Sequence, residues 1–150
     1  MIKTLPGVLV AGLLAIGLLS GCQNTEPDQP ASEPAEADVV ATGSFVDKGG
    51  QHTSGTYRIE RADGDLRLVL SDDFATDEGP DLHVVLSPTA VEDAENETAM
   101  AEGATVVALL GALSGGQTFD LPDELDVAQF RSVVIHCVQF THLYGAAPLP

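Results

Sequence analysis

Hydrophobic and polar residues alternate in short runs along most of the chain, and the longest β-forming run covers residues 132–140, SVVIHCVQF. Because strand side chains point alternately to opposite faces, Val133, Ile135 and Cys137 are expected on one face. His136 and the other intervening residues are expected on the opposite face. Both faces are mostly apolar, which predicts a strand that is covered on both sides.

The rest of the chain after residue 42 shows the same short β runs, separated by turn residues. Residues 62–65, ADGD, give a hairpin signal. Residues 88–103 are expected to form an acidic loop with a helical turn, and residues 122–130 one short helix, capped by Asp123 and facing the core through Leu125. Further strands are predicted at residues 43–46, 56–61, 66–70, 81–87, 105–110, 117–121 and 141–145. About seven or eight short strands and one short helix predict an all-β fold, an antiparallel β-sandwich or barrel.

Residues 1–21 have the plan of an export signal peptide, with Lys3, an apolar stretch and small residues ahead of Cys22. The apolar stretch is short and interrupted by glycine, which disfavours a transmembrane helix, although an uncleaved anchor is the alternative. The sequence LSGC resembles the bacterial lipoprotein signal, which implies that Cys22 is lipidated and attaches the protein to a membrane through acyl chains. Gln23 resembles the signal for outer-membrane retention, if the cell has two membranes. The predicted location is therefore the exported side of the cell envelope.

Residues 22–42 are rich in proline and acidic residues and contain no basic or aromatic residue. Such a segment buries too little apolar surface to fold, so a disordered tether is predicted. Residues 43–150 remain as one domain of ordinary size.

Acidic residues dominate the charge, with 23 Asp and Glu against 6 Lys and Arg and a net charge of −17 at pH 7. Nucleic acid is excluded as a partner because phosphate binding requires clustered basic residues. Adaptation to high salt is one explanation of the acidity and a soluble, aggregation-resistant surface is another. In either case an acidic surface suits the docking of a basic partner protein.

The chain has two cysteines, so a lipidated Cys22 would leave Cys137 without a partner in the chain. Cys137 is either a small buried hydrophobic residue or a reactive or ligating sulfur, which would need a positive neighbour or a metal. Candidate ligands beside it are the four histidines, His52, His83, His136 and His142.

These residue types could hold copper or a non-covalent haem, but no pair of them has a diagnostic metal spacing. Motifs for covalent haem and for paired-cysteine zinc sites are absent from the sequence. Asp81 and His83 share a strand face. Either the Asp81 carboxylate orients the His83 imidazole, or both side chains simply lie at a solvent-exposed edge of the sheet. Asn96-Glu97-Thr98 matches a glycosylation acceptor, which beside a bacterial lipid signal is interpreted as chance.

No nucleophile elbow, phosphate-binding loop or HExxH motif occurs, so a hydrolase or transferase is not predicted. A Cys137 nucleophile activated by His142 is the remaining enzymatic alternative.

Five segments resemble, in order, the DM-thirteen domain, the Skeletor-type domain associated with electron transfer. They are GSFVDKGGQHTSGTYRIE, LRLVLSDDF, EGPDLHVVLS, LLGALSGGQTFDLP and FRSVVIHCVQFTHLYGAAPL, and together they extend over residues 43–149. The resemblance implies that Cys137 does redox work, as a bare thiol or by holding a prosthetic group such as haem. The chain departs from the family at His136, where tryptophan is common. The resulting prediction is an electron-transfer domain acting through Cys137; the alternative is a non-catalytic binding module in which Cys137 is structural.

Overall fold

The computed structural model describes residues 37–150, which belong to one compact unit. The expected signal peptide, the lipidation site Cys22 and residues 23–36 of the expected tether lie outside the described residues. Within residues 37–150, no helix is long and apolar enough to span a bilayer.

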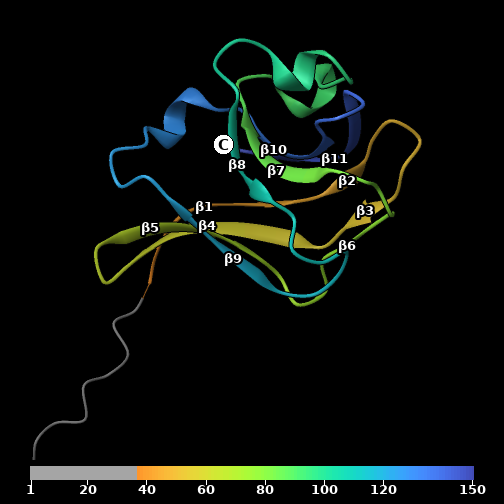
Figure 1. Cartoon of the computed structure of the whole chain (residues 1–150). Helices are drawn as coiled ribbons and strands as arrows, with labels where there is room; N and C mark the ends of the chain where they lie inside the picture. The colour runs from red at the N-terminus through yellow and green to blue at the C-terminus, as the bar shows by residue number, and fades with distance from the viewer. Residues whose placement is uncertain (1–36) are drawn as a thin grey trace, which may run out of the picture. The chain divides into compact units, whose positions relative to one another are not determined.

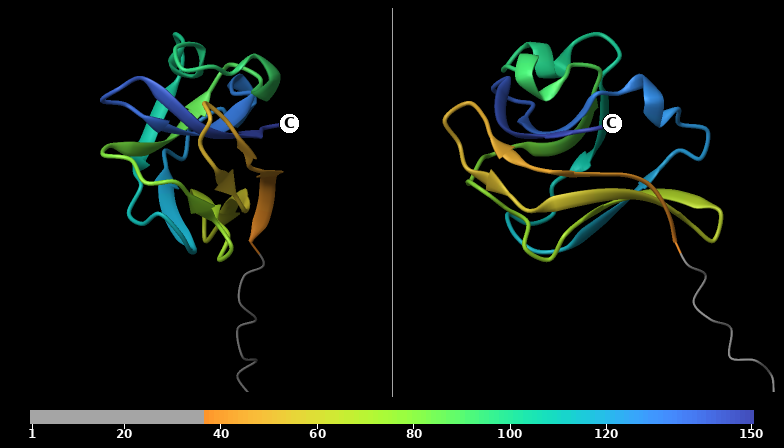
Figure 2. Two further views of the ribbon diagram at one scale, coloured as in Figure 1. Left: turned by 90° about the vertical axis from the view of Figure 1, so that its right-hand side faces the viewer. Right: turned by 180° about the vertical axis from the view of Figure 1, so that it is seen from behind.

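Two antiparallel sheets pack face to face (Figures 1 and 2). Sheet A has the strand order β1-β4-β5-β9, with bounds Asp38–Ser44, Thr56–Ala62, Asp65–Leu70 and Gln117–Leu121. Sheet B has the order β2-β11-β10-β7-β8, with bounds Val46–Asp47, His142–Pro148, Ser132–Cys137, Leu82–Ser87 and Thr105–Leu109. A small sheet joins β3 (Thr53–Ser54) to β6 (Ala75–Thr76). The all-β sandwich is the fold that the alternating pattern predicts.

The main hydrophobic core lies between the two sheets, because each strand turns one set of alternate side chains inward. Ile59 and Leu68 of sheet A and Val84 and Ile135 of sheet B are completely buried there. Cys137 belongs to the same cluster, as the alternation within β10 predicts.

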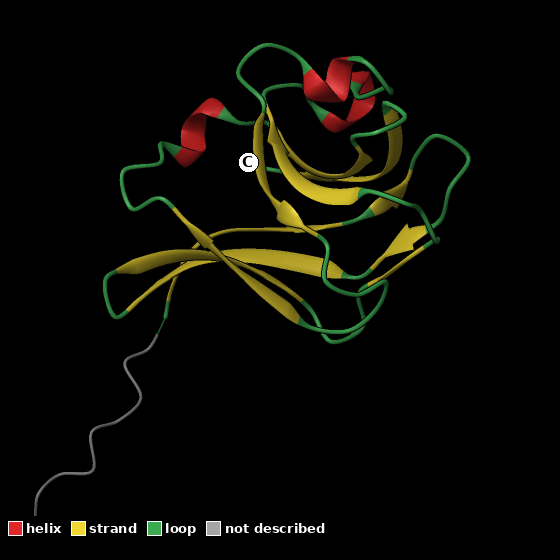
Figure 3. Ribbon diagram, viewed as in Figure 1, coloured by secondary structure: helices red, strands yellow, loops and turns green. Residues whose placement is uncertain are grey.

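A second, smaller cluster lies on the outer face of sheet B, where the acidic loop covers Val85, Val134, Leu143 and Ala146. The loop contains two 3₁₀ turns, η1 (Val91–Asp93) and η2 (Thr98–Met100), and buries Ala94 and Ala99 (Figure 3). The central strand β10 is therefore covered on both sides, as predicted, and all six of its residues are buried.

The short helix predicted at residues 122–130 is wrong in extent and in its cap. Only the 3₁₀ turn η3 (Val127–Gln129) forms, and Asp126 caps it by accepting a hydrogen bond from the Ala128 amide at 3.2 Å. Asp123 instead accepts one from the Leu66 amide at 3.3 Å. The segment must pass from sheet A to sheet B, and an α-helix advances about 1.5 Å per residue, less than half the rise of extended chain.

Several strand boundaries also differ from the predictions. Residues 43–46, predicted as one strand, are divided between β1 and β2, and the last strand, predicted at residues 141–145, is His142–Pro148. Two further differences follow from strand pairing. β1 begins at Asp38, so residues 38–42 are not part of a tether. They pair with β4 antiparallel, from Asp38 opposite Arg61 to Thr42 opposite Arg58. β10 ends at Cys137 rather than at Phe140, because β11 returns with His142 opposite Cys137 and leaves residues 138–141 for the connecting turn. Both boundaries depend on the register of the partner strand, which the local alternation does not reveal. The predicted hairpin at residues 62–65 does form between β4 and β5.

Candidate functional site

Cys137 is the last residue of β10 and lies at one end of sheet B. Its ladder partners are Leu82 on β7 and His142 on β11. The side chain is buried, with 1% exposed, and it is the free cysteine among the described residues. Cys137 is therefore followed directly by exposed residues of the chain, but solvent does not reach its sulfur.

The loop of residues 77–81 closes this end of the sandwich. The Val138 amide, directly after Cys137, donates to the Asp81 carbonyl at 3.1 Å. The Tyr144 hydroxyl donates to the Glu78 carbonyl at 3.4 Å. At Gly79 an added Cβ would lie 2.7 Å from the Tyr144 hydroxyl oxygen, so only glycine permits the loop to approach this closely.

Tyr144 is the phenol nearest to this chemistry. Burial raises its pKa, and negative charge on Cys137 or Asp77 raises it further. The ring of His142 meets the Tyr144 ring edge-on, with 5.5 Å between the ring centroids. The phenol therefore stays protonated at neutral pH and presents a hydrogen-bond donor at the Cys137 end.

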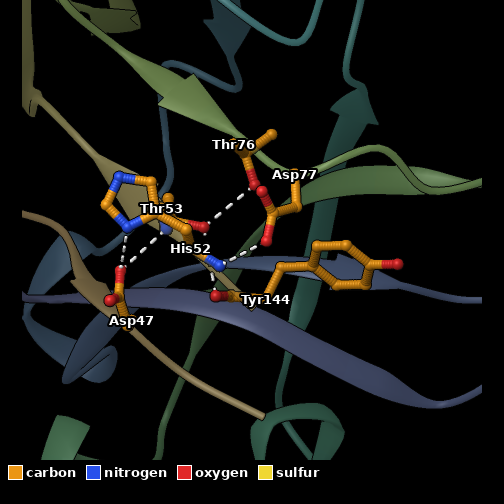
Figure 4. A network of polar contacts seen from close by, with 6 residues as sticks. All are labelled: Asp47, His52, Thr53, Thr76, Asp77 and Tyr144. Carbon is orange, nitrogen blue, oxygen red and sulfur yellow. Dashed lines mark hydrogen bonds and ion pairs between the residues drawn. The ribbon is translucent and has the colours of Figure 1, made fainter. Parts of the chain in front are cut away.

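His52 belongs to a structural network at the neighbouring turn (Figure 4). Its ring pairs with Asp47 at 2.9 Å, and its amide donates to the Asp77 carboxylate at 2.7 Å. Thr53 continues the network by donating its hydroxyl to the Tyr144 carbonyl at 3.0 Å. His52 thus helps to fix the backbone of Tyr144, and its exposed ring makes no contact with Cys137.

His136 faces away from Cys137, as the alternation predicts, and only 1% of it is exposed. Its Nε2 lies 2.8 Å from the Asn96 carbonyl oxygen, which can only accept, so Nε2 carries the hydrogen. The other ring nitrogen, Nδ1, is buried without a hydrogen-bond partner. Burial lowers the pKa of His136, the Asn96 hydrogen bond partly opposes this, and the nearby charges of His142 and His83 lower it further. His136 is accordingly a neutral, structural imidazole.

The remaining two histidines, His83 and His142, contact different residues and do not meet at one site. His83 lies opposite His136 in the ladder, and its Nδ1 is 3.2 Å from the Asp81 carbonyl oxygen and 3.6 Å from the Asp81 carboxylate. The predicted Asp81–His83 pair therefore exists, with its shorter contact to the backbone. His142 hydrogen bonds through Nε2 to the Gly49 carbonyl at 3.1 Å.

These residues do not fit a copper ion or a haem as they are arranged. In the described part of the chain, no three His, Cys, Asp or Glu side chains converge to hold a metal. A pocket of about 540 Å³ lies beside Arg58 and Gln117, and one of about 360 Å³ beside Lys48 and Asn96, but Cys137 lines neither. Any group bound through the sulfur would require this end of the sandwich to open.

Sequence reasoning missed Tyr144 and Asn96. Tyr144 lies in the predicted last strand, and its place beside Cys137 follows from the β10–β11 hairpin once the register is known. Asn96 fixes the acidic loop to sheet B, because its side chain also accepts a hydrogen bond from the Leu143 amide at 2.9 Å. A lone asparagine in an acidic loop gives no sequence signal for such a role.

Fold and site together define a small β-sandwich domain with one enclosed free thiol at the end of a central strand. The sequence matches the family model described as Electron transfer DM13 over residues 44–149, which is most of the chain. The chain belongs to this electron-transfer family. Neither the curated proteins nor the solved structures contain a match.

Proposed function

We propose that this domain transfers electrons and that Cys137 is its redox group, as a thiol or as the ligand of a bound group. The family match carries the proposal, since it extends over almost all of the described domain and includes Cys137. The position of Cys137 at a strand end, with Tyr144 and His142 beside it, supports the same assignment.

The chemistry open to a lone thiol limits the reaction. The only other cysteine in the sequence is Cys22, the proposed lipidation site, so a disulfide of Cys137 requires a thiol from another molecule. In that reaction the two thiols lose two electrons and two protons to an acceptor as the sulfur–sulfur bond forms. The attacking species is the thiolate, and solvent reaches Cys137 only if the turn of residues 138–141 or the loop of residues 77–81 moves.

The test uses the full chain with Cys22→Ser, in which Cys137 is the remaining thiol. In a buffer of reduced and oxidised glutathione, we expect Cys137 to form a mixed disulfide reversibly with release of one glutathione thiol, and we expect this couple to be lost in the additional variant Cys137→Ala. Thiol labelling of the folded protein is expected to be slow but measurable. A visible absorption spectrum reports any bound coloured group. A couple that persists in Cys137→Ala would assign the redox role elsewhere.

A second candidate function is a non-catalytic binding module in which Cys137 only packs the core, which its 1% exposure favours. In that case Cys137 would label only at the rate of global unfolding, and the protein would show no redox couple. The labelling rate in increasing denaturant separates the two functions, because local and global opening respond differently to denaturant.

We further propose that the protein is a lipoprotein of the cell envelope, anchored through Cys22 and facing the exported side. The basis is the LSGC sequence that follows the apolar N-terminal stretch. Expressed in a bacterium, the wild-type chain is expected in the membrane fraction, with the mass of an acylated N-terminal cysteine. Cys22→Ala should retain the unprocessed N-terminus and lack acyl mass. An identical intact mass after correction for the substitution would contradict lipidation.

A further inference from the structure

Exposed apolar side chains gather at the Cys137 end of the sandwich. Val138 and Phe140, in the turn after Cys137, are 38% and 67% exposed. Leu109, 59% exposed, ends β8 at the same end of sheet B, because it pairs with His83, which in turn pairs with His136. Apolar side chains that are exposed together at one end of a sheet, rather than scattered singly, are typical of a contact surface.

The turn that carries Val138 and Phe140 has a defined backbone. The Val138 amide is tied to the Asp81 carbonyl, and His142 resumes the ladder opposite Cys137. Thr141 adopts a positive φ of 49°, which completes the reversal. Val138 and Phe140 are therefore presented by a fixed turn and Leu109 by the end of a strand, which reduces the entropy lost on binding.

Carboxylates border this apolar surface. Asp77, Glu78 and Asp81 lie on the loop that closes the same end of the sandwich. The sequence has no Lys or Arg between residues 68 and 130, and none after Arg131. Lys48, on the neighbouring turn, directs its ammonium group to the Val91 carbonyl. The surface thus joins an apolar centre to a negative rim.

We infer that the surface formed by Leu109, Val138 and Phe140 with the carboxylates of residues 77–81 is the docking site for a positively charged redox protein with an apolar contact patch. The inference rests on the proposed function, because it places the partner against the residue that follows Cys137. Charge complementarity selects the partner. A second copy of this chain is disfavoured, since two negative rims would face each other.

The probe is cytochrome c, a small basic redox protein, titrated into the isotopically labelled full chain with Cys22→Ser at low salt. Amide resonances of residues 109, 138–141 and 77–81 are expected to shift on binding. Phe140→Ser should weaken binding about five- to tenfold, as for a partly buried aromatic contact. Val39→Ser is the matched control, because Val39 is 53% exposed on β1 of the other sheet and should leave the affinity unchanged.

Glu78→Lys is expected to weaken binding further and to reduce its dependence on salt. Wild-type affinity in Phe140→Ser, or resonance shifts centred on β1 and β4, would overturn the docking site. Cys137→Ala separates this inference from the proposed function: it should retain cytochrome c binding and lose the thiol–disulfide couple of the domain. A redox couple that persists in Cys137→Ala would refute the redox role of Cys137 and leave the docking site standing.

Discussion

Gly145→Ala is expected to lower the free energy of unfolding by about 2 to 3 kcal/mol, the upper part of the range for an overpacked core. An added Cβ would lie 2.4 Å from Cβ and 2.6 Å from Oγ1 of Thr53. Thr53 cannot turn aside without losing hydrogen bonds to the Thr76 hydroxyl and the Tyr144 carbonyl, at 2.9 and 3.0 Å. Strand β11 would have to shift, and Tyr144 with it.

Urea denaturation measures this effect, with Gly111→Ala as the control. There the added Cβ meets only the end of the Gln117 side chain, at 3.1 Å, so a change below about 0.5 kcal/mol is expected. In the background Thr53→Gly, which removes the obstructing atoms, Gly145→Ala should cost clearly less. If Gly145→Ala were as stable as the wild type, the close approach of β11 to Thr53 would be incorrect.

Acidification from pH 7 to pH 5 is expected to destabilise the domain through His136. Protonation would place a second N–H on Nδ1, which is buried and has no acceptor, and the pKa of His136 is accordingly lowered in the folded state. The unfolded chain takes up the proton near the ordinary pKa of about 6.5. Stability is therefore full above that pH and falls below it, with a slope of at most about 1.4 kcal/mol per pH unit.

His136→Gln provides the matched variant, because its amide nitrogen can donate to the Asn96 carbonyl and does not titrate. We expect a flatter dependence of unfolding free energy on pH in this variant. His52→Gln is the control, because it removes an exposed imidazole and leaves the buried ring of His136 in place. His83 and His142 lie near His136 and their charges act on it, so each needs its own glutamine variant. An equal slope in His136→Gln and the wild type would rule out the buried imidazole as the cause.

Most of the fold could be predicted because its strands show a local alternation of apolar and polar residues. Alternation correctly separated the two faces of β10, and Asp63 and Gly64 form the expected turn, with φ values of 56° and 97°. The errors arose where the register of a partner strand decides the boundary. β1 extends back to Asp38 because β4 is there to pair with it, and β10 stops at Cys137 because β11 begins opposite.

The site was less accessible from the sequence, because its properties depend on contacts between separate segments. The sequence identifies Cys137 and the four histidines as candidates, but spacing does not reveal whether they converge. In the structure, His136 hydrogen bonds to the Asn96 carbonyl and His142 to the Gly49 carbonyl, and His52 pairs with the Asp47 carboxylate. The enclosure of the sulfur depends on Gly79 and Tyr144, residues of a loop and of another strand.

Because Cys137 is enclosed, the rate at which its thiol reacts depends on how fast the surrounding residues open. In the proposed function, an oxidant that must contact the sulfur could react only when the end of the strand opens, so the opening rate of that region would limit the rate of turnover. A partner seated on the adjacent turn would alter that rate, and contact itself would then time the transfer of electrons.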